Sequence, residues 1–257
     1  MEIKKEVKHE GKYVYCVIES GERKNFGRGL GGYTVYTIPY RDISAVVSDT
    51  PIVEYEPNEI NVIQHEKVVE NAMREHTVLP LGFGNVFINE DRVKWLLARS
   101  YLTFKTYLKK LENKVEVGVK VFYDIEATKQ EVERTSDEVR RIKEEMALKP
   151  DREAHFFKEK LNILIEHEAL KMASERAYKY GLEIYETLKN CAEDTYLMKR
   201  IGGEMILNGA FLIHKNKITD FEKELEKVKK EYEGKGLRFQ YSGPWPPYNF
   251  ARIRVGR

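Results

Sequence analysis

The sequence has few cysteines, no excess of either charge and no long hydrophobic run. Its two cysteines, Cys16 and Cys191, fit no disulfide framework, metal-ligand spacing or redox motif. Lys and Arg number 44 against 42 Asp and Glu, and a net charge of +2 indicates no general attraction to nucleic acid or anionic membranes. The longest uncharged runs, 77–89 and 239–251, have 13 residues each, whereas a membrane-spanning helix needs about 20. We therefore expect neither a nucleic-acid nor a membrane partner.

The first residues of the chain and its length further limit the class of protein that we expect. The first residues, MEIKKEVKHEGK, contain no apolar segment of the kind found in a signal peptide. Both cysteines are most simply interpreted as buried apolar side chains, so we expect a cytoplasmic protein. A chain of 257 residues is long enough for two domains, each with its own core.

Motifs that resemble catalytic or ligand-binding signatures fail in their context. Gly27, Gly29 and Gly32 satisfy G-x-G-x-x-G, but the strand-like YTVYTIPY follows where a dinucleotide fingerprint needs a helix, which predicts a hairpin or surface loop. The six histidines form no ligand set, and no nucleophile has a neighbouring histidine or elbow glycines. His65 shares a helix face with Val62 and Val69, which favours a hydrogen-bonded core histidine. We expect no catalytic residue, no cofactor and no metal, and a binding or assembly protein rather than an enzyme.

The first half of the chain has the pattern of an α+β domain, which we place at residues 1–124. Short apolar or alternating runs predict its strands, and apolar residues at three- and four-residue steps predict its two helices. The expected strands are Tyr13–Ile18, Tyr33–Ile38, Ile43–Ser48 and Val115–Tyr123; the expected helices are 58–75, capped by Asn58, and 90–112, capped by Asn89.

The middle of the chain predicts a long helical arm. From Ile125 to Met146 the apolar residues are sparse and seven apart, on a highly charged helix that Pro150 ends. A second helix over 151–191 carries Ile163, Leu170, Ala177, Ile184 and Cys191, again seven apart. The two stripes suggest an antiparallel hairpin packed seam to seam. Two interpretations stay open, an arm that packs within the chain and an arm that binds a partner or a second copy.

The last part of the chain predicts the order strand, strand, helix, strand. A hairpin joins Tyr196–Ile201 to Met205–His214 through Gly202–Gly203, a helix covers 218–232, and Leu237–Tyr241 alternates into a final strand. Together with the C-terminal half of the long helix, this order suits a ferredoxin-like sandwich. The fold class we predict is α+β: two α+β domains, at 1–124 and 125–257, joined by a long helical arm.

The segment GPWPPYNF, Gly243–Phe250, has the most unusual composition in the chain. Three prolines surround one of two tryptophans, and they exclude both a helix and a central strand. One interpretation is a strap that closes the C-terminal core with Trp245, which we favour because the preceding strand directs the segment back over its own sheet. The other is an aromatic anchor for a partner, formed by Trp245, Tyr248 and Phe250.

Several strings in the right order resemble one protein family. They are KYVYCVIE (12–19), AVVSD (45–49), the helix around His65, VLPLGFGNVF (78–87) and GPWPPYNF (243–250). Together they resemble the gas vesicle accessory family GvpF/GvpL over nearly the whole chain. The resemblance implies a ferredoxin-like C-terminal half. It also implies a minor shell component or assembly factor that acts in nucleation of the gas vesicle shell and contacts the wall protein GvpA and other accessory proteins. The alternative is a small-molecule-binding regulator or enzyme with a cleft between its two domains.

Overall fold

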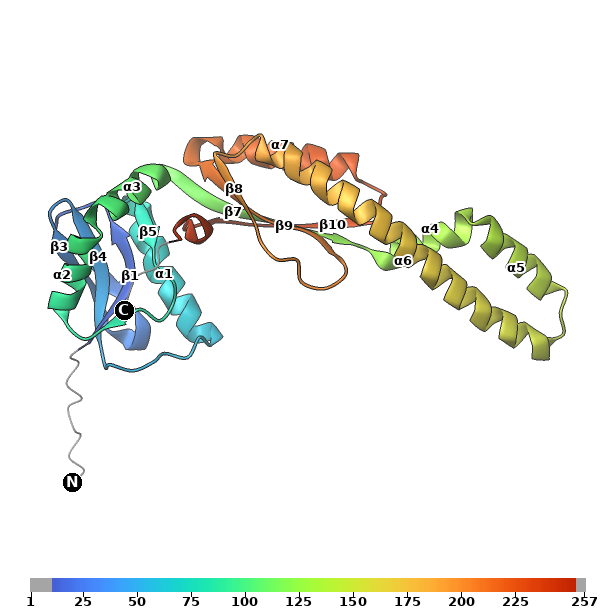
Figure 1. Cartoon of the computed structure of the whole chain (residues 1–257), viewed down its shortest axis with the longest axis horizontal. Helices are drawn as coiled ribbons and strands as arrows, with labels where there is room; N and C mark the ends of the chain where they lie inside the picture. The colour runs from blue at the N-terminus through green and yellow to red at the C-terminus, as the bar shows by residue number, and fades with distance from the viewer. Residues whose placement is uncertain (1–10, 253–257) are drawn as a thin grey trace, which may run out of the picture. The chain divides into compact units, whose positions relative to one another are not determined.

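The computed structural model describes residues 11–252, which form two units (Figure 1). The first contains the described residues up to Glu116 together with those from Pro244 onward, and the second contains Val117–Gly243. The domain boundary, which we expected near Asp124, therefore lies between Glu116 and Val117, within the strand that precedes Asp124. The C-terminal segment, which we assigned to the second domain, belongs to the first.

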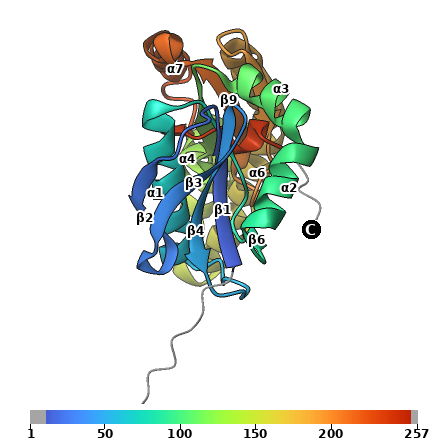
Figure 2. The same cartoon turned by 90° about the vertical axis from the view of Figure 1, so that its left-hand side faces the viewer.

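The N-terminal unit is a sheet between two layers of helices. Its strand order is β2-β3-β4-β1-β5, with β6 also paired to β1. Helix α1 packs against β1, β2 and β5, whereas α2 packs against β3 and β4, so that the sheet separates α1 from α2 and α3 (Figure 2). The strands are β1 (Gly11–Ile18), β2 (Asn25–Arg28), β3 (Thr34–Tyr40), β4 (Ile43–Thr50), β5 (Val78–Pro80) and β6 (Val86–Phe87).

The central strands are apolar on both faces because helices cover both faces. In β1 every residue except Lys12 is buried, and β4 is buried from Ile43 to Ser48. The two strands pair antiparallel, and the register shifts between Val14 and Cys16. Continuous apolar runs of this kind are what a sheet covered on both sides requires.

The helices of this unit begin where the sequence predicted. Asn58 caps α1 (Glu59–Glu75) by accepting a hydrogen bond from the Asn61 N–H, and Asn89 caps α2 (Glu90–Arg99) through the Arg92 N–H. Both caps are confirmed. The single helix expected over 90–112 is wrong in one respect, because the helical conformation breaks at Ser100 and α3 (Tyr101–Leu111) follows.

The C-terminal unit has the ferredoxin-like fold. Its strand order is β10-β7-β9-β8, and the chain runs β7, α6, β8, β9, α7, β10. The elements are β7 (Lys114–Tyr123), β8 (Asp194–Leu197), β9 (Met205–His214), α7 (Ile218–Glu231) and β10 (Leu237–Trp245). Helices α6 and α7 cover one face of the sheet (Figure 1). The two-domain α+β fold class and the ferredoxin-like half are thus confirmed.

One strand changes domain relative to the sequence prediction. The strand over 115–123 was assigned to the N-terminal domain, but β7 is the first strand of the ferredoxin-like unit. Val117, Val119 and Val121 are fully buried in the core that α6 and α7 share. Alternation shows that one face of a strand is buried, but it carries no information about which sheet the strand joins.

The helical arm consists of α4 (Ile125–Thr135), α5 (Asp137–Ala147) and the N-terminal half of α6 (Asp151–Lys189). Ser136 separates α4 from α5 and caps α5 through the Val139 N–H. Both short helices pack on α6, so the interpretation of an arm that packs within the chain is confirmed. Its small core is formed by Val132, Val139, Ile142, Leu161, Ile165 and Ala169.

The predicted stripe of apolar residues seven apart is wrong for the first half of α6, where these side chains are not buried. Ile163 and Leu170 are 65% and 55% exposed, whereas Ile184 at the other end is fully buried. An α-helix of 3.6 residues per turn drifts by roughly 20° per heptad, so a strict seven-residue repeat leaves its starting face over a helix this long. Within residues 11–252, no helix is long and apolar enough to cross a membrane.

Candidate functional site

The C-terminal segment is anchored in the N-terminal unit. After β10 ends at Trp245, Pro246 and Pro247 are buried, Phe250 is 6% exposed, and the Tyr248 ring lies 6.2 Å from that of His65. Trp245 itself is 43% exposed, which contradicts our expectation that it closes the C-terminal core. Because β10 is an edge strand it tolerates Pro244 and continues to Trp245, so the buried aromatic residues are those that follow the prolines.

A buried carboxylate fixes this segment in place. Glu116 is 7% exposed, and its two oxygens accept hydrogen bonds from the Asn249 backbone N–H at 2.9 Å and from Nδ2 of Asn249 at 2.6 Å. Burial raises the pKa of the Glu116 carboxyl, and the two Asn249 donors partly offset that rise. The candidate residues Tyr248 and Phe250 therefore lie on either side of Asn249, which Glu116 holds in place. Trp245, the third candidate residue, is the one that is well exposed.

A hydrogen-bonded histidine lies under the same segment. His65 is 2% exposed, its Nδ1 lies 3.0 Å from the Tyr13 hydroxyl, and its Nε2 lies 3.1 Å from the Leu81 carbonyl. The Leu81 carbonyl accepts only, so Nε2 carries the proton and Nδ1 accepts from Tyr13, which in turn accepts from the Gly84 N–H. Burial lowers the pKa of His65 to about 4. The expected core histidine is confirmed, and it ties α1 and β1 to residues 81–84.

The glycine-rich loop serves close packing. A Cβ on Gly29 would lie 2.2 Å from the Tyr15 hydroxyl, which accepts a hydrogen bond from the Leu30 N–H at 2.9 Å. Leu30 is buried at 1% exposure. Part of the pattern that mimics a dinucleotide fingerprint is therefore explained by a loop held tightly against β1.

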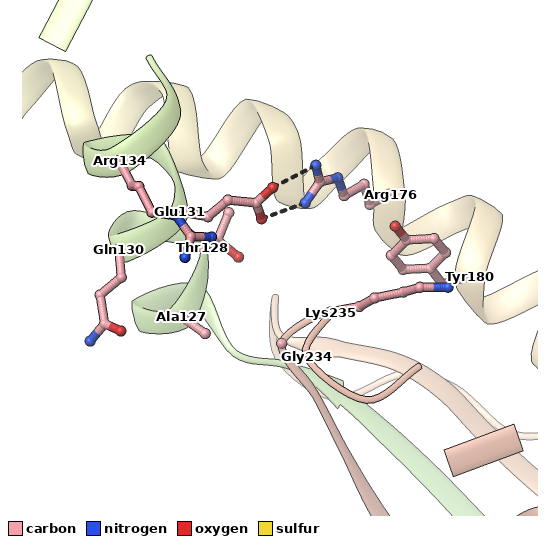
Figure 3. A pocket seen from close by; sticks show the side chains of 10 residues that line it. Ala127, Thr128, Gln130, Glu131, Arg134, Arg176, Tyr180, Gly234 and Lys235 are labelled. Atoms are coloured by element: carbon pink, nitrogen blue, oxygen red, sulfur yellow. Dashed lines mark hydrogen bonds and ion pairs between the residues drawn. The ribbon is translucent and has the colours of Figure 1, made fainter. Parts of the chain in front are cut away.

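A polar pocket of about 390 Å³ lies where the arm meets the rest of the C-terminal unit (Figure 3). Arg176 on α6 forms a two-pronged ion pair with Glu131 on α4, at 2.7 and 3.0 Å, and this pair lowers the pKa of Glu131. Lys235 lies over the Tyr232 ring at 4.3 Å. The ion pair between Glu131 and Arg176 holds α4 against α6, and Arg134 lines the same pocket.

A row of exposed apolar side chains follows one face of α6. Leu170, Tyr178 and Leu182 are 55%, 72% and 48% exposed, and they border two cavities of about 690 and 240 Å³. The end of β8 and the loop after it form the opposite side, where Arg200 lines both cavities and Leu197 lines the smaller one. We call this surface, from Leu170 to Tyr185 on α6 together with Leu197–Leu207, the α6 groove.

The α6 groove was not predicted from the sequence. Leu170, Ser174, Tyr178 and Leu182 follow one another at four-residue steps, and this second stripe could have been found beside the inward one. In the part of the chain that the structure describes, no three His, Cys, Asp or Glu side chains are grouped to hold a metal ion.

Comparison with known proteins decides the family. The model of the family described as gas vesicle synthesis protein GvpL/GvpF matches residues 11–252. This chain belongs to the GvpL/GvpF family. Gas vesicle protein F of Haloferax mediterranei is 26% identical over 248 residues, which are 95% of this chain and 94% of that protein. Gas vesicle protein F of a Nostoc species is 28% identical over 232 residues, or 88% and 91% of the two chains.

A solved relative has the same fold. The crystal structure of GvpF from Anabaena superposes with a TM-score of 0.73 at 26% identity and covers 95% of this chain and 97% of that one. GvpF from Microcystis aeruginosa, at 23% identity and a TM-score of 0.68, shares the fold. The resemblance seen in the sequence is confirmed, and membership of this gas vesicle family supports a role connected with gas vesicles.

Proposed function

We propose that this protein acts in nucleation and assembly of the gas vesicle shell, as a minor component that binds the wall protein GvpA. Membership of the GvpL/GvpF family supports the proposal, and the observation that carries it physically is the exposed apolar face of α6. Contiguous exposed apolar surface typically marks an interaction site. A small hydrophobic wall subunit aggregates unless another protein covers its apolar surface before it is placed.

The proposed role requires binding and no catalysis. It assigns the protein to the cytoplasm and the gas vesicle, with GvpA and other accessory proteins as partners and with no cofactor. Of the three aromatic residues proposed to bind a partner, Trp245 is the accessible contact; Tyr248 and Phe250 support it by fixing the segment on the N-terminal unit.

An affinity pull-down from cells that co-express the tagged full chain, GvpA and the accessory proteins tests the proposal. GvpA recovered in amounts comparable to the chain is the expected result, and its absence beyond the level of a tag-only control would contradict the proposal.

A matched pair of variants tests Trp245 in the same experiment. Trp245 and Trp95 are 43% and 45% exposed, and Arg99 lies 4.9 Å from the Trp95 ring. We expect Trp245→Ala to lower recovery of GvpA several-fold and Trp95→Ala to leave it unchanged. Equal recovery with both variants would remove Trp245 from the interface while leaving the function in place.

A further inference from the structure

The α6 groove has the geometry of a seat for a helix. On α6 the groove is lined by the larger Leu170, Tyr178 and Leu182, with Ser174 between them, while Gly181 packs against the Ile206 carbonyl of β9. The side chains at four-residue steps form a ridge of the kind that packs against another helix. Much of this apolar ridge is uncovered within its own unit, since Leu170, Tyr178 and Leu182 are 55%, 72% and 48% exposed.

The two cavities lie along α6 at a helical spacing. The larger is lined on α6 from Leu170 to Tyr178 and the smaller from Tyr178 to Tyr185. Their centres on α6 are thus about seven residues apart, roughly 11 Å at 1.5 Å per residue. Side chains at positions i and i+7 of a bound helix have the same separation, and such pairs are the usual anchors of helix-in-groove recognition.

The charge at the groove identifies a property of the bound helix. Arg200 lines both cavities and makes no ion pair with any described residue, and Lys199 precedes it in the exposed loop after β8. Glu204 lines the larger cavity but not the smaller one. A guanidinium that lines both cavities favours a carboxylate on the partner, placed between its two apolar anchors.

We propose that the α6 groove binds an amphipathic helix of the wall protein, with apolar residues at i and i+7 in the two cavities and an acidic residue facing Arg200. This inference rests on the proposed function, because it names the surface through which GvpA is held. The inference places this contact with the wall protein on the C-terminal unit. Trp245 is then a separate contact, on the N-terminal unit.

Charge substitutions in the groove, made in the full chain co-expressed with GvpA, test this inference. Tyr178→Asp combined with Leu182→Asp should lower recovery of GvpA at least tenfold, and Arg200→Glu at least threefold. Phe156→Asp is the matched control, because Phe156 is 67% exposed on the same helix and lines neither cavity. The control should keep wild-type recovery, and equal circular dichroism spectra and melting temperatures should show that all variants fold.

Photo-crosslinking then identifies the occupant. A crosslinking amino acid at Tyr178 or Leu197 should attach to residues of GvpA that are three, four or seven apart. Attachment to residues two apart indicates a strand and overturns the helix. Attachment to a second copy of this chain, or a changed oligomeric state of the groove variants without GvpA, assigns the groove to self-association and overturns the inference.

The outcomes separate this inference from the proposed function. If the wild type recovers GvpA and the groove variants do so equally well, the groove inference fails and the function stands. If the wild type recovers no GvpA, the proposed function itself fails.

Discussion

The Tyr13 hydroxyl donates a hydrogen bond to Nδ1 of His65 across 3.0 Å, and both side chains are buried. The bond requires a neutral imidazole, because a protonated His65 has no lone pair to accept with. The same ring donates to the Leu81 carbonyl, so one histidine connects β1, α1 and residues 81–84.

Stability of the N-terminal unit should therefore fall in mild acid. The folded-state pKa of His65 is about 4 against an ordinary value of 6.5, so unfolded chains bind a proton at a pH where folded chains do not. Stability from this group is present above pH 6.5 and is lost as the pH falls toward 4. The loss between pH 7 and pH 5 amounts to about 2 kcal/mol.

Urea unfolding followed by tryptophan fluorescence, at pH 7 and pH 5, measures this loss. His65→Gln is the control, because it keeps one donor and one acceptor without titrating in this range. Its unfolding free energy should depend less on pH than that of the wild type, by about the same 2 kcal/mol. An equal pH dependence in both proteins would show that His65 is not the group responsible.

Gly29→Ala should destabilise the N-terminal unit. The new methyl group would lie 2.2 Å from the Tyr15 hydroxyl and 2.8 Å from Cγ2 of Val35, both on the core side of the loop. Overpacking of this kind costs about 1–3 kcal/mol. Gly82→Ala in the same unit meets nothing within 4 Å and should change the melting temperature little. Similar melting temperatures for the two variants would contradict the tight packing of the loop.

Two aromatic residues of the C-terminal segment should differ sharply in their effect on folding. Phe250 is 6% exposed, so Phe250→Ala should cost about 3–5 kcal/mol. Trp245 is 43% exposed, and Trp245→Ala should cost less than about 1 kcal/mol. Guanidinium unfolding of both variants makes the comparison, and a larger loss for Trp245→Ala would restore the idea that this ring closes a core.

The helical arm should unfold locally while the ferredoxin-like core of its unit stays folded. Leu161 belongs to the small core shared with Val132 and Val139, whereas the ferredoxin-like core around Phe211 is a separate cluster. Leu161→Ala should speed amide exchange in α4, α5 and the first half of α6, and should leave β7 and β9 as slow as in the wild type. Ile163→Ala, at an exposed position of the same helix, serves as the control. Faster exchange in β9 as well would show that arm and sheet unfold as one.

The sequence predicted where helices and strands lie better than it predicted which sheet or unit each of them joins. The caps at Asn58 and Asn89 and the strand Met205–His214 follow from local signals and match the structure. The assignment of β7 and of the C-terminal segment to their units depends on long-range pairing, which periodicity does not encode. The break at Ser136 had a local signal, since a serine N-cap followed by two acidic residues in the first turn is a typical helix start.

The candidate site was predictable in part. Composition and prolines drew attention to Trp245, Tyr248 and Phe250, but which of them is exposed depends on where β10 ends. The α6 groove combines one face of a helix with a loop that follows a later strand, and such a surface appears only once both are placed.

Co-elution of GvpA with this protein in size-exclusion chromatography, after co-expression and without detergent, tests the central claim most directly. We predict that GvpA expressed alone sediments, and that with the full chain it stays in the supernatant and elutes with the chain in one peak. GvpA that sediments equally in the presence of the chain, or that elutes apart from it, would contradict the account.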